Sequence, residues 1–441
     1  MTPRERLFAL EQFGIKLGLD NIQRLLVALG HPERSFRSVH IAVTNGKGSV
    51  TAMVERGLRS AGHATGRYTS PHLSDIEERI AINGRPIAAE VFDATAADVL
   101  AVVERLRSDG TLESWPTFFE VTTAMAFVTF ARQQVDAAVV EVGLGGRFDA
   151  TNTVSPAVHA ITSIAFDHER HLGSTLEAIA LEKAGIIKPE TPVVVGSMAD
   201  SARAVIATRA AQVRAPLIEA DREVRVTSRM DAGATVLDLE TPVARYDDLH
   251  LALNGQHQIA NAAVAVRILE VGRNRGLANA SRDVRTALVD VEWPARLEWL
   301  ELSPGRHVLV DAAHNPAGAH ALADYLRSTG MAPLPLVLAV MKDKDVDAMI
   351  RELAPIVSGF VATQVDSPRC MSSSALAERV VQTVPDARVW QAPDPERALE
   401  LALRQSPRAI IAGSIFLVGP LRAKLIARGA IPSKMSVKPC D

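Results

Sequence analysis

Cysteine is scarce in this chain of 441 residues, which contains only Cys370 and Cys440. Two cysteines cannot build a disulfide framework or a zinc site made of cysteine ligands. A charge excess is also missing, because 48 Lys and Arg stand against 51 Asp and Glu, a formal net charge of -3. General nucleic-acid binders usually carry a strong basic excess, so we expect no nucleic-acid partner.

Long apolar segments are missing as well. Runs such as residues 334–341 are short and interrupted by proline or charge, whereas a membrane span needs about 18 or more consecutive apolar residues. The first ten residues include Glu5 and other charges, so they lack the apolar stretch of a signal peptide. We therefore expect a soluble cytoplasmic protein without a membrane partner.

The composition that is present is typical of globular proteins. Hydrophobic residues make up 47% and charged residues 22% of the chain, which excludes disorder for most of it. The length predicts two or three domains. Short apolar, β-branched runs alternate with helix-like segments almost throughout. This alternation predicts an α/β fold, with mostly parallel sheets that are flanked by helices on both faces.

The predicted elements form two blocks. The first has strands at 39–44, 136–142, 158–164 and 191–196, with helices at 49–61, 117–134 and 174–187. It also has a hairpin over 79–87 around Asn83-Gly84 and a β-rich excursion over 222–253. The second block has strands at 307–311, 334–340, 359–363, 387–390 and 409–412, with helices at 318–326 and 395–404.

Pro294 marks the boundary between the blocks, because proline biases the preceding residue to an extended conformation and so disfavours a helix across it. We predict two domains, residues 1–293 and a smaller domain of residues 294–441. From about Pro432 onward we expect a loose tail.

The most distinctive motif lies between a predicted strand and a predicted helix and reads Thr44-Asn45-Gly46-Lys47-Gly48-Ser49. Glycines let backbone N–H groups approach phosphate oxygens, and a helix N-terminus and a lysine add positive charge. The spacing departs from the general P-loop pattern, because Ile41 stands where that pattern has its first glycine and another glycine follows Lys47. The residues indicate a variant phosphate loop, with a glycine-rich turn and a solvated lysine as the alternative.

Acids and histidines follow two further predicted strands. Glu141 ends one strand, and Asp167-His168 follows another. The carboxyl ends of parallel strands open into the ligand crevice of such sheets, and Mg²⁺ needs hard oxygen ligands near nucleotide phosphates. An acid that only caps a turn is the alternative for Glu141. His168 and His171 could indicate zinc, but no further Cys or His ligand is nearby in the sequence.

For two further motifs, the residue types alone do not decide whether they bind a ligand. Lys183, in Glu182-Lys183-Ala184-Gly185, is typical of a solvated helix lysine. The segment Asp311-Ala312-Ala313-His314-Asn315-Pro316 follows a strand and precedes a helix, which Asn315 can cap and Pro316 can begin. Asp311 and His314 would then face a crevice, with a turn that binds nothing as the alternative.

Together and in this order, these motifs resemble those of the folylpolyglutamate synthase and dihydrofolate synthase family, within the Mur-ligase-like superfamily. The likeness extends from Gly18 to about Lys424. It implies a P-loop-type, Mur ligase central-domain-like first domain and a Rossmann-like second domain. It also explains the variant loop, since this family has a glycine after the loop lysine.

The resemblance further implies roles for individual residues. ATP would be bound by the loop of residues 44–49 together with Asn261, Arg296, Asp311 and His314. Two Mg²⁺ ions would be held by Ser70 (in Tyr68-Thr69-Ser70-Pro71-His72-Leu73), Glu141, His168 and Lys183, the last carboxylated by CO₂ to a carbamate. Catalytic roles fall to Lys47, Lys183 and His314. The pterin substrate would be held by Gly18, Leu19, Asp20, Thr117, Phe118, Phe119, Glu120, Arg147 and Phe148.

The implied activity is ATP-dependent addition of L-glutamate to dihydropteroate, to the glutamate tail of folates, or to both, through an acyl phosphate. The partners are then small molecules, and we expect a monomer. One alternative is another Mur-type amino-acid ligase, but these usually carry an additional N-terminal domain and only 43 residues precede this loop. The other is a non-catalytic ATP-binding switch, which would not need two metals and a carbamate.

Overall fold

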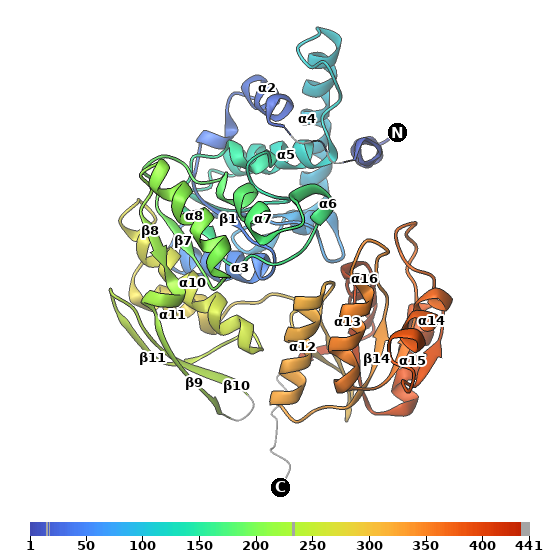
Figure 1. Cartoon of the computed structure of the whole chain (residues 1–441). Helices are drawn as coiled ribbons and strands as arrows, with labels where there is room; N and C mark the ends of the chain where they lie inside the picture. Colours follow the sequence, from blue (N-terminus) through green and yellow to red (C-terminus); the bar gives the residue numbers. More distant parts are fainter. Residues whose placement is uncertain (15, 17, 232–233, 434–441) are drawn as a thin grey trace. The chain divides into compact units, whose positions relative to one another are not determined.

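The computed structural model describes residues 1–14, 16, 18–231 and 234–433. The chain divides into two compact units (Figure 1). The first comprises residues 1–226, 238–247 and 260–291, and the second comprises 227–237, 248–259 and the chain from 292 onward. In the described part of the chain, none of the helices has the length and apolar character to cross a membrane.

The first unit is built on an eight-stranded sheet of order β4-β3-β2-β5-β1-β6-β7-β8. Its strands are β1 (Arg37–Ala42), β2 (Thr65–Tyr68), β3 (Ile80–Ile82), β4 (Arg85–Pro86), β5 (Ala137–Glu141), β6 (Val158–Ile161), β7 (Val193–Val195) and β8 (Leu217–Glu219). The neighbouring pairs β2–β5, β5–β1, β1–β6, β6–β7 and β7–β8 are parallel. At the other edge of the sheet, β3 pairs antiparallel with both β2 and β4. The predicted hairpin is confirmed: Asn83 and Gly84 both have positive φ, 50° and 79°, as a tight hairpin turn requires.

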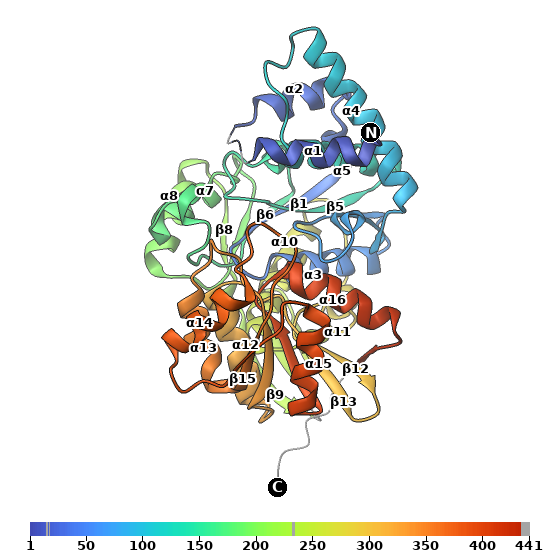
Figure 2. The same ribbon diagram turned by 90° about the vertical axis from the view of Figure 1, so that its right-hand side faces the viewer.

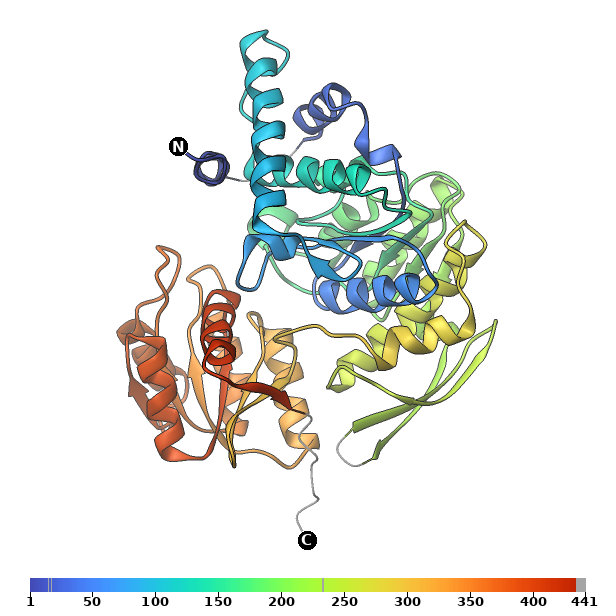
Figure 3. The same ribbon diagram turned by 180° about the vertical axis from the view of Figure 1, so that it is seen from behind.

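Helices cover both faces of this sheet. They are α1 (Pro3–Ala9), α2 (Asp20–Ala28), α3 (Lys47–Ser60), α4 (Ala89–Ser108), α5 (Phe118–Arg132), α6 (Glu169–Leu172), α7 (Leu176–Ala184), α8 (Asp200–Gln212), α9 (Ala220–Glu223), α10 (Gln256–Arg273) and α11 (Ser281–Val289). Short 3-10 helices are η1 (Leu10–Phe13), η2 (Pro32–Arg34), η3 (Ile76–Arg79) and η4 (Ala150–Thr153). Helix α1 lies against α4 and α5 (Figure 2), and α3 packs against α11 (Figure 3). Burial on both faces explains the continuous apolar strands, such as the fully buried β5.

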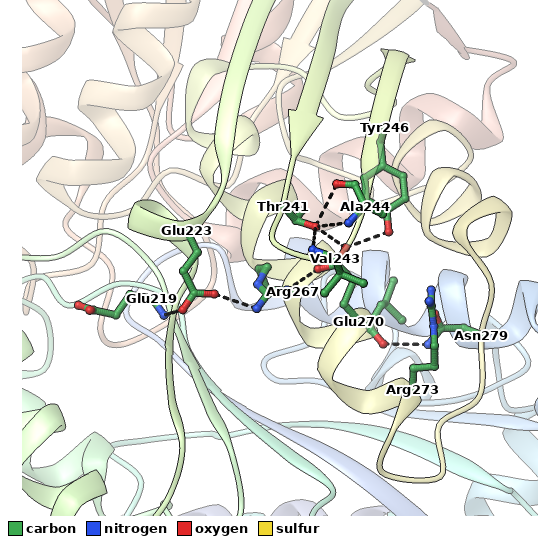
Figure 4. A network of polar contacts seen from close by, with 11 residues as sticks. Glu219, Glu223, Thr241, Val243, Ala244, Tyr246, Arg267, Glu270, Arg273 and Asn279 are labelled. Atoms are coloured by element: carbon green, nitrogen blue, oxygen red, sulfur yellow. Dashed lines mark hydrogen bonds and ion pairs between the residues drawn. The ribbon is translucent and has the colours of Figure 1, made fainter.

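The predicted β-rich excursion is a three-stranded sheet of order β11-β10-β9. Its strands are β9 (Arg225–Asp231), β10 (Ala234–Glu240) and β11 (Arg245–His250). A buried network of polar side chains connects β11 and the turn before it to α10 (Figure 4). Glu270 of α10 accepts hydrogen bonds from the Thr241 hydroxyl at 2.7 Å and the Tyr246 hydroxyl at 3.0 Å. Arg267 donates to Glu270 and, at 2.8 Å, to Glu223.

This network should contribute strongly to stability. We expect Glu270→Gln to lower the free energy of unfolding by about 3–5 kcal/mol, because loss of one partner of a buried ion pair leaves the other charge uncompensated. The matched control is Glu240→Gln, since Glu240 pairs with Arg225 at the exposed surface and should change stability by less than about 0.5 kcal/mol. Urea unfolding measures both, and equal small losses would contradict the structural role given to Glu270.

The second unit contains a seven-stranded sheet of order β16-β15-β14-β17-β13-β12-β18. Its strands are β12 (Glu298–Ser303), β13 (Arg306–Val310), β14 (Leu334–Leu338), β15 (Val357–Ala362), β16 (Val389–Gln391), β17 (Arg408–Ala412) and β18 (Ile431–Ser433). Its helices are α12 (Pro316–Ser328), α13 (Val346–Leu353), η5 (Ala354–Ile356), α14 (Ser373–Thr383), α15 (Pro395–Gln405) and α16 (Ile415–Ala427). The neighbouring pairs β16–β15, β15–β14, β14–β17 and β17–β13 are parallel, whereas β12 pairs antiparallel with β13 and β18. The predicted α/β fold is confirmed for both units.

Two local features of this unit are the start of α12 and the chain from Pro432 onward. The Asn315 side chain caps α12 by accepting from the Gly318 N–H at 2.8 Å, and Pro316 begins the helix, as predicted. The expected loose tail from Pro432 is wrong at its start, because Pro432 belongs to β18 and pairs with β12. An edge strand there satisfies backbone groups of β12. The remaining tail, with Cys440, lies outside the described residues.

Candidate functional site

Four predicted site segments of the first unit meet at one edge of its sheet. Strands β2, β5, β1 and β6 are consecutive neighbours and parallel, so their carboxyl ends share an edge. Ser70 follows β2, Glu141 ends β5, the loop of residues 44–49 follows β1, and His168 follows β6. Topology therefore gathers, at the usual ligand edge of such sheets, residues that are about 100 positions apart in sequence.

The predicted phosphate loop, residues 44–49, is held by its neighbours on both sides. The Thr44 N–H donates to the Ser163 carbonyl at 3.1 Å, and the Ala165 N–H donates to the Thr44 hydroxyl oxygen at 3.1 Å. Gly46 has φ +90°, and a Cβ at this position would lie 2.7 Å from Asn261 Oδ1. Only glycine therefore fits, and the contact brings the predicted nucleotide residue Asn261 against the loop. Helix α3 begins at Lys47, two residues before the predicted helix start.

Lys183 is buried at this edge, with an exposed fraction of 4%. Its Nζ donates to the carbonyl of Val43, directly before the loop, at 3.1 Å. Burial and the nearby charge of Lys47 lower the Lys183 pKa to about 7, although Asp167 and Asp149 oppose the shift. The interpretation of Lys183 as a solvated helix lysine, drawn from residue type alone, is therefore wrong.

The glycine turn after β5 allows this burial. A Cβ on Gly146 would lie 2.8 Å from the Glu182 carbonyl, so the turn approaches α7 more closely than a side chain permits. The Arg147 N–H donates to the same carbonyl at 2.8 Å, and its guanidinium pairs with the Glu182 carboxylate at 2.6 Å. These contacts hold the last turn of α7, with Lys183, against the site.

Glu141 and His168 differ in their surroundings. Glu141 is buried at 2% exposure. Burial lowers the pKa values of Arg67 and Arg79, and the negative charge of Glu141 is among the charges that partly offset both shifts. His168 is exposed, with φ 51°, and its N–H donates to the Asp167 carboxylate at 2.9 Å.

Metal-binding clusters of three or more His, Cys, Asp or Glu side chains do not occur within the described residues. The predicted magnesium ligands include only two residues of these types, Glu141 and His168. Their other members are the Ser70 hydroxyl and a modified Lys183. The predicted set is thus mainly an oxygen set, of the hard-donor kind that Mg²⁺ prefers.

Asp149 is a further buried carboxylate near Lys47 that none of the sequence motifs identifies. It is 5% exposed, and its carboxylate accepts hydrogen bonds from the Leu144 N–H at 2.8 Å and from the N–H and hydroxyl of Thr151. Burial raises the Asp149 pKa, while these donors and the positive charge of Lys47 lower it. The Asp-x-Thr spacing after the glycine turn is typical of a side-chain-capped turn and could have identified this carboxylate.

The predicted pterin segments also approach one another. Gly18, Asp20 and Glu120 line a cavity of about 190 Å³. The other lining residues are Lys16, Asn21, Arg24, Glu113 and Ser114. The cavity therefore joins the segment around Gly18 to the start of α5. Leu19 packs against the adjacent hydrophobic core.

Several predicted pterin residues have clear structural contacts of their own. Thr117 and Glu120 form the capping box of α5, in which the Glu120 carboxylate accepts from the Thr117 N–H at 2.7 Å. Phe118 stacks on Phe8 with ring centroids 5.8 Å apart, and Phe119 lies 6.0 Å from the Tyr68 ring. Farther along the chain, the exposed residues Arg147 and Phe148 contact each other, with the guanidinium 4.5 Å from the ring centroid.

The predicted nucleotide residues of the second unit lie around one turn after β13. The buried Asp311 carboxylate accepts from the Leu297 N–H at 2.9 Å and from the Ala313 N–H at 2.8 Å. Burial raises the Asp311 pKa, and the positive charge of Arg296 opposes that shift. His314 donates from Nδ1 to the Ala312 carbonyl at 2.9 Å. The structure thus places Arg296 and Asp311 within electrostatic reach of each other.

Comparison with known proteins identifies the family. Residues 41–269 match the Mur ligase middle domain, and residues 295–417 match the Mur ligase glutamate ligase domain. A dihydrofolate synthase/folylpolyglutamate synthase of Mycobacterium tuberculosis is 39% identical over 401 residues, which cover 87% of this chain and 82% of that protein. The chain belongs to the folylpolyglutamate synthase/dihydrofolate synthase family.

Further members of this family agree over almost the whole chain. The Bacillus subtilis dihydrofolate synthase/folylpolyglutamate synthase is 35% identical over 421 residues, which cover 94% of this chain and 96% of that protein. The solved structure of Mycobacterium tuberculosis folylpolyglutamate synthase complexed with ADP superimposes with a TM-score of 0.88, at 35% identity, over 98% of this chain and 99% of that one. The predicted family is confirmed, and a member with both Mur ligase domains is a ligase enzyme.

Proposed function

We propose that this chain is an ATP-dependent ligase that joins L-glutamate to dihydropteroate, to folates that already carry glutamate, or to both. Family membership supports the glutamate ligase activity, and the ADP in the Mycobacterium tuberculosis structure supports ATP as the energy source. The observation that carries the proposal is the buried Lys183 beside the phosphate loop, together with Glu141 and Asp149 at the same sheet edge. A nucleotide switch would not require this constellation.

In the proposed mechanism, the chain's own residues neutralise phosphate charge and hold the loop in position. The substrate carboxylate attacks the γ-phosphate of ATP, ADP leaves, and the amine of glutamate then displaces phosphate from the acyl phosphate. Lys47, at the start of α3, neutralises charge on the outer phosphate oxygens. Asn261 and the Ser163–Ala165 backbone keep the loop in its phosphate-binding shape. We propose His314, Arg296 and Asp311 as the nucleotide residues of the second unit.

Magnesium fits the oxygen donors of this edge. We propose Ser70, Glu141, His168 and a carbamylated Lys183 as its ligands, for two ions. The bound metal would supply screening of phosphate charge. The Lys183 carbamate would form by attack of the neutral amine on CO₂, which creates one C–N bond and releases one proton. A buried lysine with a pKa of about 7 provides that neutral amine, and the carbamate provides hard oxygen atoms.

We propose that residues 1–293 form the ATP- and pterin-binding domain and that residues 294–441 form the C-terminal domain. The cavity bordered by Gly18, Asp20 and Glu120 is the proposed pterin side. Leu19, Thr117, Phe118 and Phe119 are close to these residues in sequence, and we propose Arg147 and Phe148, after β5, as further pterin residues. We further propose that the enzyme acts as a cytoplasmic monomer.

Product analysis tests the proposed function. The protein is incubated with ATP, Mg²⁺ and L-glutamate, and with dihydropteroate or tetrahydrofolate as the acceptor. Mass spectrometry should show an acceptor heavier by one glutamate unit, with one ADP formed per product. Reactions without glutamate or with another amino acid are the controls. Failure to add glutamate to either acceptor, with ATP consumed on another carboxylate, would overturn the assigned substrate class.

Metal dependence gives a separate prediction. Activity should vanish with a chelator and return with Mg²⁺ or Mn²⁺. Glu141→Ala and His168→Ala should each lose most of the rate, because each removes a proposed ligand. Glu190→Ala is the matched control, since Glu190 forms an exposed ion pair with Arg214. Rates are measured across a Mg²⁺ titration, and a variant that keeps the wild-type rate at limiting Mg²⁺ removes its residue from the ligand set.

A further inference from the structure

Two histidines are completely buried in the sheet of the first unit. His40 of β1 and His159 of β6 stand opposite each other in the parallel pairing, and both have an exposed fraction of 0%. Their ring centroids are 6.2 Å apart. Burial lowers the pKa of His40 to about 3 and places the His159 pKa well below its usual value, and the charge of Lys188 contributes to both shifts. Both rings are therefore neutral near pH 7.

The tautomer of His40 follows from its neighbours. Its Nε2 lies 2.9 Å from the Thr151 hydroxyl oxygen. That hydroxyl has one proton, which it donates to the Asp149 carboxylate. The hydroxyl oxygen must therefore accept from His40, so His40 carries its proton on Nε2 and a lone pair on Nδ1.

The tautomer of His159 is the opposite one. The Lys188 backbone N–H donates to His159 Nε2 at 3.0 Å, so this ring carries its proton on Nδ1. Neither Nδ1 atom has a hydrogen-bond partner among the described residues. A ring nitrogen lies only about a bond length from the ring centre, so centroids 6.2 Å apart leave the Nδ1 atoms beyond direct hydrogen-bond distance, about 2.7–3.2 Å.

The chain of donors ends at Asp149, in the candidate site. Asp149 receives the Thr151 hydroxyl, and its negative charge acts on Lys183, while the charge of Lys47 acts on Asp149. Without a donor from His40, the Thr151 hydroxyl oxygen is left buried without that partner and the hydroxyl loses the polarisation that strengthens its bond to Asp149.

We propose that His40 is a positioning residue: its Nε2–H, through Thr151, fixes the Asp149 carboxylate beside Lys47 and Lys183. The catalytic consequence rests on the proposed ligase function. The tautomers themselves do not, because the hydrogen bonds of the folded chain set them.

Kinetics of matched variants test the positioning role. His40→Leu removes the donor, and kcat should fall by about five- to tenfold, the loss expected for about one buried hydrogen bond, with the KM for ATP within about twofold. His40→Gln retains an N–H donor on a side chain of similar reach and should recover most of the loss. Thr151→Val interrupts the same chain, so the double variant His40→Leu/Thr151→Val should be no slower than the slower single variant. Additive losses, or no rescue by glutamine, would reduce His40 to a packing residue and overturn the proposal.

Spectroscopy of the unmodified protein tests the tautomers without relying on activity or on variants that fold. In a ¹⁵N-histidine-labelled sample, two-bond N–H correlations should show the Nε2–H form for His40 and the Nδ1–H form for His159, unchanged from pH 6 to pH 8. Reversed tautomers, or a charged His40 at pH 7, would overturn the proposal even if the ligase activity is confirmed. Correct tautomers in a protein that ligates nothing would overturn only the proposed function.

Discussion

The Lys47→Ala protein is expected to fold normally and to lose ligation by a factor of at least about 10²–10³, the effect of removing one preorganised group that stabilises developing charge. Lys47 lies within the proposed phosphate loop of residues 44–49 and begins α3, and it is half-buried rather than part of the core. Its proposed task is to neutralise phosphate charge, so the loss should appear in kcat and in ATP affinity and not in unfolding. ADP formation, ATP binding by calorimetry and urea unfolding measure these three quantities.

Lys424→Ala is a suitable control for this experiment. Lys424 is an exposed residue of α16 that forms a surface ion pair with Glu396, and such pairs contribute little to stability. Its replacement should leave turnover unchanged. Near-normal turnover in a folded Lys47→Ala protein would contradict the assignment of residues 44–49 as the phosphate loop, whatever the identity of the pterin substrate.

Most of the fold could be predicted because its strands are buried on both faces. Such strands are continuous apolar runs, and β5 and β17 lie within one or two residues of the predicted segments 136–142 and 409–412. The start of α3 could not be predicted as well. Gly46 and Gly48 disfavour a helix by intrinsic propensity, and it is the left-handed conformation of Gly46, φ +90°, that allows the helix to begin at Lys47.

The residues of the candidate site could be predicted where they form a local motif, and not where contacts between distant parts of the chain bring them together. The loop of residues 44–49 is visible as a motif. The burial of Lys183 depends on the approach of Gly146 to α7 and on the Val43 carbonyl, which is 140 positions away. His40 and His159 stand opposite each other because β1 pairs with β6, and no pattern in a single sequence predicts that pairing. Because distant contacts bury Lys183, its residue type alone favoured a solvated lysine.

The second large effect is expected at Lys183. Lys183→Ala should be nearly inactive, because it removes the proposed carbamate and with it oxygen ligands for Mg²⁺. Short carboxylic acids such as acetate or propionate should partly restore the rate, since they can place oxygen atoms in the space that the side chain leaves. Lys183→Arg offers a control: a guanidinium cannot become a carbamate and fills that space, so no acid should rescue it. Initial rates across an acid titration measure the rescue.

Carbamate formation also has a direction in pH. Only the neutral amine reacts with CO₂, and the folded protein lowers the Lys183 pKa to about 7 from 10.5. The neutral fraction therefore rises as pH increases through about 7, and at fixed dissolved CO₂ the carbamate occupancy should be higher at pH 8 than at pH 6. Carbon-13 NMR with labelled CO₂ detects the carbamate directly, with Lys183→Ala as the blank.

A crystal structure of active, metal-bound enzyme gives the decisive outcome for this residue. Density at Lys183 should extend beyond Nζ as a planar group. An unextended lysine there, or the absence of a labelled carbamate signal in active enzyme, would contradict the modification. Such a result would leave the phosphate loop and Glu141 in place, since they rest on other residues. In that case the buried amine would have to be neutral, because an ammonium ion at this edge would repel the magnesium that Glu141 is proposed to bind.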